Sequence, residues 1–211
     1  MGIPVLILGE SGSGKSASMR NFEANDVSVF NVAGKPLPFR KRLPQMPTAD
    51  YGQIMNAISK SGKKAFVIDD SQYLMCFESF AKAKEKGYDK YTNMALNFYN
   101  LVQFVIRQTP PDTVVYFLHH VEQDSNTGKI KAKTLGKMLD NQLTLEGLFA
   151  IVLYCVTDGK RHIFQTQSDG VVTAKSPMEM FPPEIENDLK MVDTTIREYY
   201  GMNETKGDET K

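Results

Sequence analysis

Only two cysteines, Cys76 and Cys155, occur among the 211 residues of the chain. They lie far apart and lack the short spacing of zinc ligands, so the sequence excludes a disulfide framework and indicates no zinc site. We expect two buried thiols.

An excess of charge of either sign is also absent, since 25 basic and 25 acidic residues give a net charge of zero. Any contact with nucleic acid therefore has to come from a local patch. No apolar stretch approaches the roughly 20 residues of a membrane-spanning helix, and Met1 leads directly into an apolar run without room for a signal peptide. We expect no membrane partner and a cytoplasmic location.

The composition is typical of a globular protein, with 41% hydrophobic and 24% charged residues. Near-continuous apolar segments alternate with helical patterns, and an Asp158-Gly159 turn predicts an antiparallel hairpin. The apolar segments are 4–8, 27–32, 65–68, 113–120 and 150–156, and the helical ones are 15–22, 51–61 and 91–108. This alternation predicts an α/β fold with a mainly parallel sheet covered by helices on both faces. We expect one domain over residues 1–200 and a flexible tail over 201–211.

The segment GESGSGKS at residues 9–16 fits the pattern G-x-x-x-x-G-K-[ST] directly after an apolar run. Its glycines let the backbone adopt positive φ and turn N–H groups toward phosphate oxygens at the positive end of the following helix. In such a loop the lysine, here Lys15, reaches the β and γ phosphates, and the hydroxyl, here Ser16, binds Mg²⁺. The pattern therefore predicts ATP and Mg²⁺ as ligands. The expected nucleotide-binding residues are Gly9, Glu10, Ser11, Gly12, Ser13, Gly14, Lys15, Ser16 and Ala17.

Acidic and histidine side chains follow two of the predicted strands. Asp69 ends the strand 65–68 at the carboxyl edge of the sheet, where it can hold Mg²⁺ through water, and Asp70 is a candidate to orient the attacking water. His119 and His120 end the strand 113–120 at the same edge, and one of them is a candidate to contact the γ-phosphate and distinguish ATP from ADP. The alternatives are acids that merely end a strand and histidines that satisfy local carbonyl groups.

The order of these motifs resembles the RecA-type P-loop ATPases, in particular the short phage-encoded members implicated in recombination and single-strand annealing. The resemblance covers about residues 3–200 and rests on GESGSGKS, VIDD, YFLHHVEQD, GKMLDNQL and IFQTQSDGVVTAKSPMEMF. It implies a RecA-like core, ATP hydrolysis, a ring or filament of identical subunits, and the host cytoplasm as the location if the chain is phage-encoded.

Two details of the resemblance concern catalysis. By position, Lys175 matches the basic residue that reaches the nucleotide of a neighbouring subunit, and the alternative is a solvated lysine on a loop. The sequence also departs from the family, whose water-activating glutamate follows the second strand, because FNVAGKPLPF carries Asn31 and no acid there. Either Asp70 or Glu10 substitutes for that glutamate, or hydrolysis is slow.

A cluster of lysines in GKIKAKTLGK lies just beyond the strand 113–120 and is expected on a loop. Such a cluster can neutralise several phosphates of single-stranded DNA without raising the overall charge, although a solvated loop is the alternative. The candidate DNA-binding residues are Lys129, Lys131, Lys133 and Lys137. The first functional hypothesis is therefore an ATPase that assembles on single-stranded DNA.

Two other functions remain open. A small-molecule kinase would use the same glycine loop but commonly closes an arginine-rich lid over the phosphates, and the six arginines of this chain are scattered apart from the FRKR segment. That weakens the kinase hypothesis. A nucleotide-gated interaction module with little turnover is favoured by the missing glutamate.

Overall fold

The computed structural model describes residues 1–87, 89–135 and 144–202, so most of the predicted tail lies outside the described residues. The strands are β1 (Ile3–Gly9), β2 (Val27–Asn31), β3 (Gln45–Met46), β4 (Ala65–Asp69), β5 (Val114–Gln123), β6 (Ile130–Ala132), β7 (Ile151–Thr157), β8 (His162–Gln165) and β9 (Glu184–Glu186). The helices are α1 (Tyr51–Lys60), α2 (Gln72–Ala81), α3 (Asp89–Gln108) and α4 (Leu189–Tyr199), with 3₁₀ turns η1 (Ser16–Asn21) and η3 (Leu145–Leu148). None of the helices in the described ranges is long and apolar enough to cross a membrane.

The strands form one nine-stranded sheet in the order β3-β2-β4-β5-β1-β7-β8-β9, with β6 paired to β5 off this path. The pairs from β3 to β7 are parallel, whereas β8 and β9 continue the sheet in antiparallel fashion. The predicted α/β fold, with a mainly parallel sheet and an antiparallel hairpin, is therefore confirmed. Because the parallel strands all end at one edge, the loops that follow β1, β2, β4 and β5 gather there.

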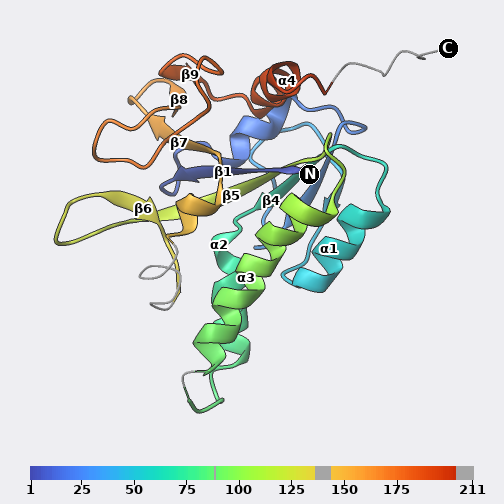
Figure 1. The fold of residues 1–211 in the computed structure, drawn as a ribbon, viewed down its shortest axis with the longest axis vertical. Helices are drawn as coiled ribbons and strands as arrows, with labels where there is room; N and C mark the ends of the chain where they lie inside the picture. Colours follow the sequence, from blue (N-terminus) through green and yellow to red (C-terminus); the bar gives the residue numbers. More distant parts are fainter. Residues whose placement is uncertain (88, 136–143, 203–211) are drawn as a thin grey trace.

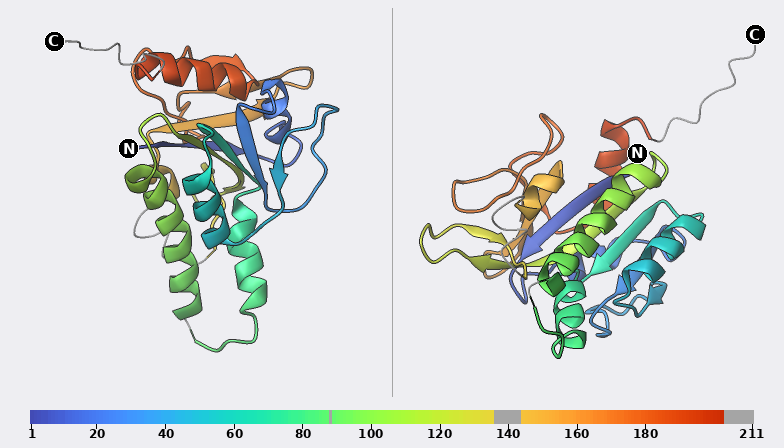
Figure 2. Two further views of the ribbon diagram at one scale, coloured as in Figure 1. Left: turned by 90° about the vertical axis from the view of Figure 1, so that its right-hand side faces the viewer. Right: turned by 60° about the horizontal axis from the view of Figure 1, so that its bottom comes forward.

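Helices cover both faces of the sheet. Figures 1 and 2 show α4 and η1 on one face and α1, α2 and α3 on the other. Along β1, Leu6 and Leu8 pack into the cluster that contains Phe98 of α3, while Val5 and Ile7 pack into the cluster beneath α4. Successive side chains point to opposite faces, and burial of both faces explains why the predicted strands were apolar at nearly every position.

Helices α2 and α4 are not among the helical segments that the sequence predicted, and α2 shows one reason for such a miss. Leu74 and Met75 are buried against the sheet, but Phe77 and Phe80 on the outer side are 37% and 74% exposed. Apolar residues therefore surround this helix, and no polar face marks the helical period. Together with α3 it forms an antiparallel pair that projects from the sheet (Figure 1).

The first helical segment lies where the sequence predicted it, but it is a 3₁₀ turn rather than an α-helix. The Ser18 N–H is shared between the carbonyl oxygens of Gly14 and Lys15, at 3.0 and 3.2 Å. The Ser18 hydroxyl also donates to the Lys15 carbonyl, and such side-chain bonds compete with regular helix geometry. The turn therefore begins directly at the glycine-rich loop.

The lysine-rich segment after β5 is a β-hairpin, so its prediction as a loop was wrong. Strand β5 continues to Gln123, and β6 pairs with it in antiparallel fashion. The Asp124 carboxylate closes the turn by accepting hydrogen bonds from the N–H groups of Asn126 and Thr127, and Gly128 takes a φ of +70°. These turn residues fix the register of the hairpin.

One of the two expected buried thiols is only half-buried. Cys155 in β7 is 1% exposed, whereas Cys76 lies on the partly exposed side of α2. The prediction of two buried thiols is therefore wrong for Cys76.

Candidate functional site

The loop between β1 and η1 is tight, and its glycines occupy positions that other residues cannot take. Gly12 and Gly14 have φ values of +81° and +101°, in the left-handed region that favours glycine. A Cβ atom at Gly14 would lie 2.8 Å from Nδ1 of His162, and one at Gly9 would lie 2.7 Å from the carbonyl oxygen of Cys155. Each glycine of the pattern is thus required either by its φ value or by close packing.

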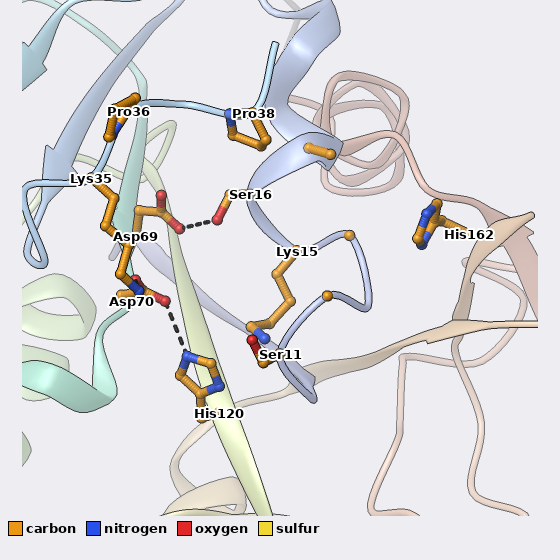
Figure 3. A pocket seen from close by; sticks show the side chains of 13 residues that line it. Ser11, Lys15, Ser16, Lys35, Pro36, Pro38, Asp69, Asp70, His120 and His162 are labelled. Carbon is orange, nitrogen blue, oxygen red and sulfur yellow. Dashed lines mark hydrogen bonds and ion pairs between the residues drawn. The ribbon is translucent and has the colours of Figure 1, made fainter.

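A cavity of about 350 Å³ opens beside this loop. Six of the nine residues predicted to bind a nucleotide line it. Figure 3 shows Lys15 and Ser16 of this loop on the side of the cavity opposite Asp69 and Asp70. The lining residues are Ser11, Gly12, Gly14, Lys15, Ser16, Ala17, Lys35, Pro36, Pro38, Asp69, Asp70, His120 and His162. Gly9, Glu10 and Ser13 do not line the cavity but shape the loop behind it.

The side chain of Lys15 folds back onto the glycine loop. Its Nζ donates hydrogen bonds of 2.8 Å to the carbonyl oxygens of Gly9 and of Glu10. The residue is only 6% exposed, and burial lowers the pKa of its ammonium group. The loop therefore holds a poorly solvated cation, which is suited to bind an anion.

The outer side of the loop is anchored to the strands β7 and β8. The Ser13 carbonyl oxygen accepts a hydrogen bond of 2.7 Å from the Nδ1–H of His162 and one of 3.0 Å from the thiol of Cys155. Burial raises the pKa of Cys155 to about 11, so this thiol stays protonated and can donate. His162 was not predicted as a site residue, although it follows the Asp158-Gly159 turn and β8 therefore starts at the edge where β7 ends.

Ser16 and Asp69 meet across the cavity as predicted. The Ser16 hydroxyl donates a hydrogen bond of 2.7 Å to Oδ1 of Asp69, which lies 53 residues away in sequence at the end of β4 (Figure 3). Burial raises the pKa of Asp69 to about 6, against the opposing effect of the Ser16 hydrogen bond. A hydroxyl and a carboxylate oxygen are thereby presented side by side, which is the type of ligand that Mg²⁺ prefers.

Asp70 is held by two basic side chains. Its backbone has a φ of +59°, and its carboxylate lies 2.8 Å from Nζ of Lys35 and 3.1 Å from Nε2 of His120. Burial raises the pKa of Asp70, but the hydrogen bonds from His120 and Lys35 outweigh it and lower the pKa to about 2. A non-glycine residue in the left-handed region is strained and persists only when its surroundings hold it there.

The two adjacent histidines lie in different surroundings. His120 lines the cavity, whereas His119 is fully buried, with Nδ1 2.9 Å from the Ser71 hydroxyl and Nε2 2.8 Å from the Lys133 carbonyl oxygen. Burial lowers the pKa of His119 to about 4, so the ring is neutral near pH 7. Of the two sensor candidates, only His120 faces the cavity, and its role stays a prediction.

Lys35 and the prolines beside it are a part of the cavity that sequence analysis missed. They come from the segment that follows β2, in which the sequence predicted no site residue. Lys35 lies with its Nζ 5.0 Å from the centre of the Tyr73 ring and ion-paired to Asp70. Pro36 and Pro38 complete that wall of the cavity.

A second cavity, of about 480 Å³, brings together three of the lysines singled out in the sequence. Lys129 and Lys131 of the hairpin line it together with Lys175, whose backbone N–H and carbonyl pair with Val152 of β7 at 2.8 Å each. Lys131 also lies 3.4 Å from Glu122. Lys175 is not among the described residues that line the glycine-loop cavity, so its reach into a neighbour's site stays a prediction.

The remaining two DNA-binding candidates are not in this cavity. Lys133 follows β6, and its backbone N–H donates to the His120 carbonyl while its own carbonyl accepts from His119. Lys137 lies outside the described residues. The predicted lysine cluster is therefore brought together in part, around the β5–β6 hairpin.

The raised pKa of Asp69 predicts a pH dependence of stability. The folded-state pKa of about 6 lies above the ordinary value of 3.8, so this group's contribution to stability is full below about pH 4 and is lost as the pH rises through 6. We expect Asp69→Asn to gain roughly 2 kcal/mol relative to the parent between pH 4 and pH 7.

Urea unfolding of both proteins at the two pH values, with a chelator present, measures this difference. Other titrating groups cancel between the two proteins. Asp70 also does not disturb the comparison, because its pKa is lowered and its contribution is lost only below about pH 4. If the difference in unfolding free energy between Asp69→Asn and the parent is the same at both pH values, the pKa of Asp69 is not raised in the folded state.

Within the described parts of the chain, no three His, Cys, Asp or Glu side chains gather to form a metal cluster by themselves. The pair Ser16 and Asp69 is thus the best candidate for a divalent cation, with further ligands from phosphate and water. Neither a protein-family model nor a curated protein matches the sequence.

Proposed function

We propose that the chain binds ATP together with Mg²⁺ and hydrolyses the β–γ phosphoanhydride bond on a RecA-like core. The observation that carries the proposal is the 2.7 Å hydrogen bond between the Ser16 hydroxyl and Asp69, formed directly beside the glycine loop and Lys15. Each of these groups has a place in the binding of a metal-bound triphosphate. The cavity volume of about 350 Å³ lies within the range of small-molecule sites.

Different residues of the cavity are proposed to bind the phosphates, the metal ion and the attacking water. The N–H groups of the glycine loop and Nζ of Lys15 hold the phosphates, while Ser16 and Asp69 hold Mg²⁺, which would neutralise charge on the transferred phosphoryl group. Asp70 and His120, 3.1 Å apart, orient the attacking water. With a pKa of about 2, Asp70 is a weak proton acceptor, so it positions water rather than removing its proton, and slow basal hydrolysis follows.

Single-stranded DNA is the proposed macromolecular partner, and assembly of identical subunits on it is part of the proposal. Support comes from the β5–β6 hairpin, because β5 carries His120 at the nucleotide cavity and then continues into the lysine-bearing turn. Strand β5 and the turn that follows it thus run from one cavity to the other. Phosphate contacts at the hairpin can in this way be coupled to the groups around the terminal phosphate.

The experiment that tests the proposal is ATP hydrolysis measured with and without single-stranded DNA. Hydrolysis stimulated by DNA supports an ATPase that acts on DNA. Tight ATP binding with negligible hydrolysis in both conditions would indicate a nucleotide-gated interaction module instead, and phosphate transfer to a nucleoside or metabolite would indicate a kinase.

The lysines of the hairpin make a separate prediction. Replacing Lys129, Lys131 and Lys133 together by alanine should weaken binding of single-stranded DNA and reduce the salt dependence by about two units of slope, at roughly 0.7 for each phosphate that is no longer neutralised. Basal hydrolysis should survive. Fluorescence anisotropy with a labelled oligonucleotide at several salt concentrations measures both effects.

A charge-matched control for this triple variant carries alanine at Lys41, Lys60 and Lys64, which are exposed and line neither cavity. The control should keep the salt slope of the parent. Superimposable binding curves for the parent and the hairpin variant would show that the hairpin lysines are only solvated surface.

A further inference from the structure

Asn31 occupies the position at which the family resemblance implies a glutamate, and its side chain forms hydrogen bonds to Lys35 and Gln45. Its Nδ2 donates to the Lys35 carbonyl at 2.6 Å and to Oε1 of Gln45 at 2.8 Å, while its Oδ1 accepts from the Lys35 N–H at 3.2 Å. Asn31 is only 6% exposed. It therefore fixes the backbone of Lys35 at the carboxyl end of β2.

The segment around Lys35 is shaped to pass along the cavity. Gly34 takes a φ of +67°, and its N–H donates to the Asn31 carbonyl at 3.2 Å, so the chain reverses directly after β2. Pro36 and Pro38 then stiffen the stretch that lines the cavity. The backbone at Lys35 is held from both sides, whereas its side chain is free to change partner.

The Lys35 side chain faces the same cavity as Lys15, from the other side. Figure 3 shows Lys35 with Asp69 and Asp70 on one wall and the glycine loop with Lys15 on the other. In the ion pair with Asp70 the lysine side chain is 60% exposed and the aspartate side chain 13%. The ammonium group thus lies on the exposed side of the pair, where a phosphate can approach it. A phosphate carries more charge than a carboxylate, so it can displace Asp70 from the ammonium group.

We propose that Lys35 contacts the terminal phosphate of the bound triphosphate within its own chain, leaving Asp70 to do so. This inference rests on the proposed ATP-binding function and names the residue that distinguishes ATP from ADP. Lys35 lies beside Asp69 and Asp70, on the wall where the metal and the attacking water are proposed, whereas Lys15 belongs to the glycine loop itself. Its departure also releases Asp70 from one of its two basic partners, so that the carboxylate can orient water only when a triphosphate is present.

The proposal takes the outer cation from the same chain, without excluding a contact from a neighbouring subunit. The resemblance had led us to expect the outer cation from a neighbouring subunit through Lys175, but Lys175 lines the hairpin cavity and Lys35 lines the nucleotide cavity. Asn31, which replaces the expected acid after β2, is the residue that holds the backbone of Lys35.

The test compares the binding of a nonhydrolysable ATP analogue and of ADP, each with Mg²⁺, by calorimetry. Lys35→Gln should bind the triphosphate analogue about tenfold more weakly, because one charge-assisted hydrogen bond is removed, and should bind ADP within twofold of the parent. Lys35→Arg keeps the charge and should recover most of the preference for the triphosphate. Lys41→Gln is the control, since Lys41 lies on the same segment but pairs with Glu23 away from the cavity.

An unchanged ratio of triphosphate to ADP affinity in Lys35→Gln, with the parent binding both, would overturn the inference and leave the proposed function standing. A parent that binds neither nucleotide would overturn both. Mixing Lys35→Gln with Lys15→Ala decides whether the cation acts within its own chain: hydrolysis should stay at the sum of the two variants. Recovery of hydrolysis in the mixture would place Lys35 in a neighbour's site and contradict the assignment.

Discussion

Lys15→Ala is expected to lose most of its affinity for ATP. The Lys15 ammonium group is the cation of the glycine loop, and its two hydrogen bonds to the carbonyl oxygens of Gly9 and Glu10 keep it in place. Because burial already disfavours its charged form, an anion that approaches gains a strong electrostatic contact. Charge-assisted hydrogen bonds contribute about 1.5–3 kcal/mol each, so affinity should fall by at least about a hundredfold.

Titration with a fluorescent ATP analogue measures this loss. Lys15→Met is the matched variant, because it keeps the apolar stem of a side chain that is only 6% exposed and removes only the charge. Both variants should lose affinity, and urea unfolding measured in parallel checks that each remains folded at the temperature of the titration. Affinity equal to that of the parent in either variant would remove the glycine loop from nucleotide binding.

The glycine loop and Asp69 could be predicted from the sequence because their positions depend on short-range rules. The spacing of Gly9, Gly12 and Gly14 fixes a tight turn wherever the segment occurs, and an acid that ends a buried parallel strand must lie at the carboxyl edge. The register of β1 and β4 against β5 then brings Ser16 and Asp69 to that edge.

The orientation of the two histidines could not be predicted in the same way. Successive residues of a strand point to opposite faces, so one of His119 and His120 had to leave the cavity. In a strand with one solvated face, the alternation of polar and apolar neighbours would indicate which histidine faces the cavity. Here Phe117 and Leu118 are both fully buried on opposite faces, and apolar patterning carries no information about direction.

The contacts of Lys35, His162 and Lys175 join segments that are distant in sequence or lie on irregular connections, and local patterns do not determine them. Lys35 is directed by the Asn31 amide, a polar contact that no spacing rule reveals. His162 is directed by the Ser13 carbonyl, 149 residues away. Lys175 is fixed beside the hairpin because its backbone pairs with Val152, so the residue that the resemblance directed to a nucleotide lines the other cavity.

The second large effect is expected for Asp69→Asn, which should abolish Mg²⁺-dependent hydrolysis and largely spare ATP binding. An asparagine has nearly the same volume, and its Oδ1 can still accept the hydrogen bond from Ser16, but it carries no charge to hold the cation. A metal ion at the phosphates is worth several kcal/mol in the transition state, so the turnover number should fall about a thousandfold. ATP affinity without Mg²⁺ should change by no more than a few fold.

The loss of hydrolysis could also arise if the variant were unfolded. The raised pKa of Asp69 predicts the opposite effect on stability. Because the carboxylate of Asp69 is buried and its pKa is raised to about 6, the asparagine variant should be at least as stable as the parent at pH 7 in the presence of a chelator. Asp112→Asn, which breaks an ion pair with Lys64 at the surface, is the matched control and should keep full activity. Hydrolysis by Asp69→Asn at the rate of that control, over a range of Mg²⁺ concentrations, would exclude Asp69 from the metal site and leave Ser16 without the partner on which the proposed function rests.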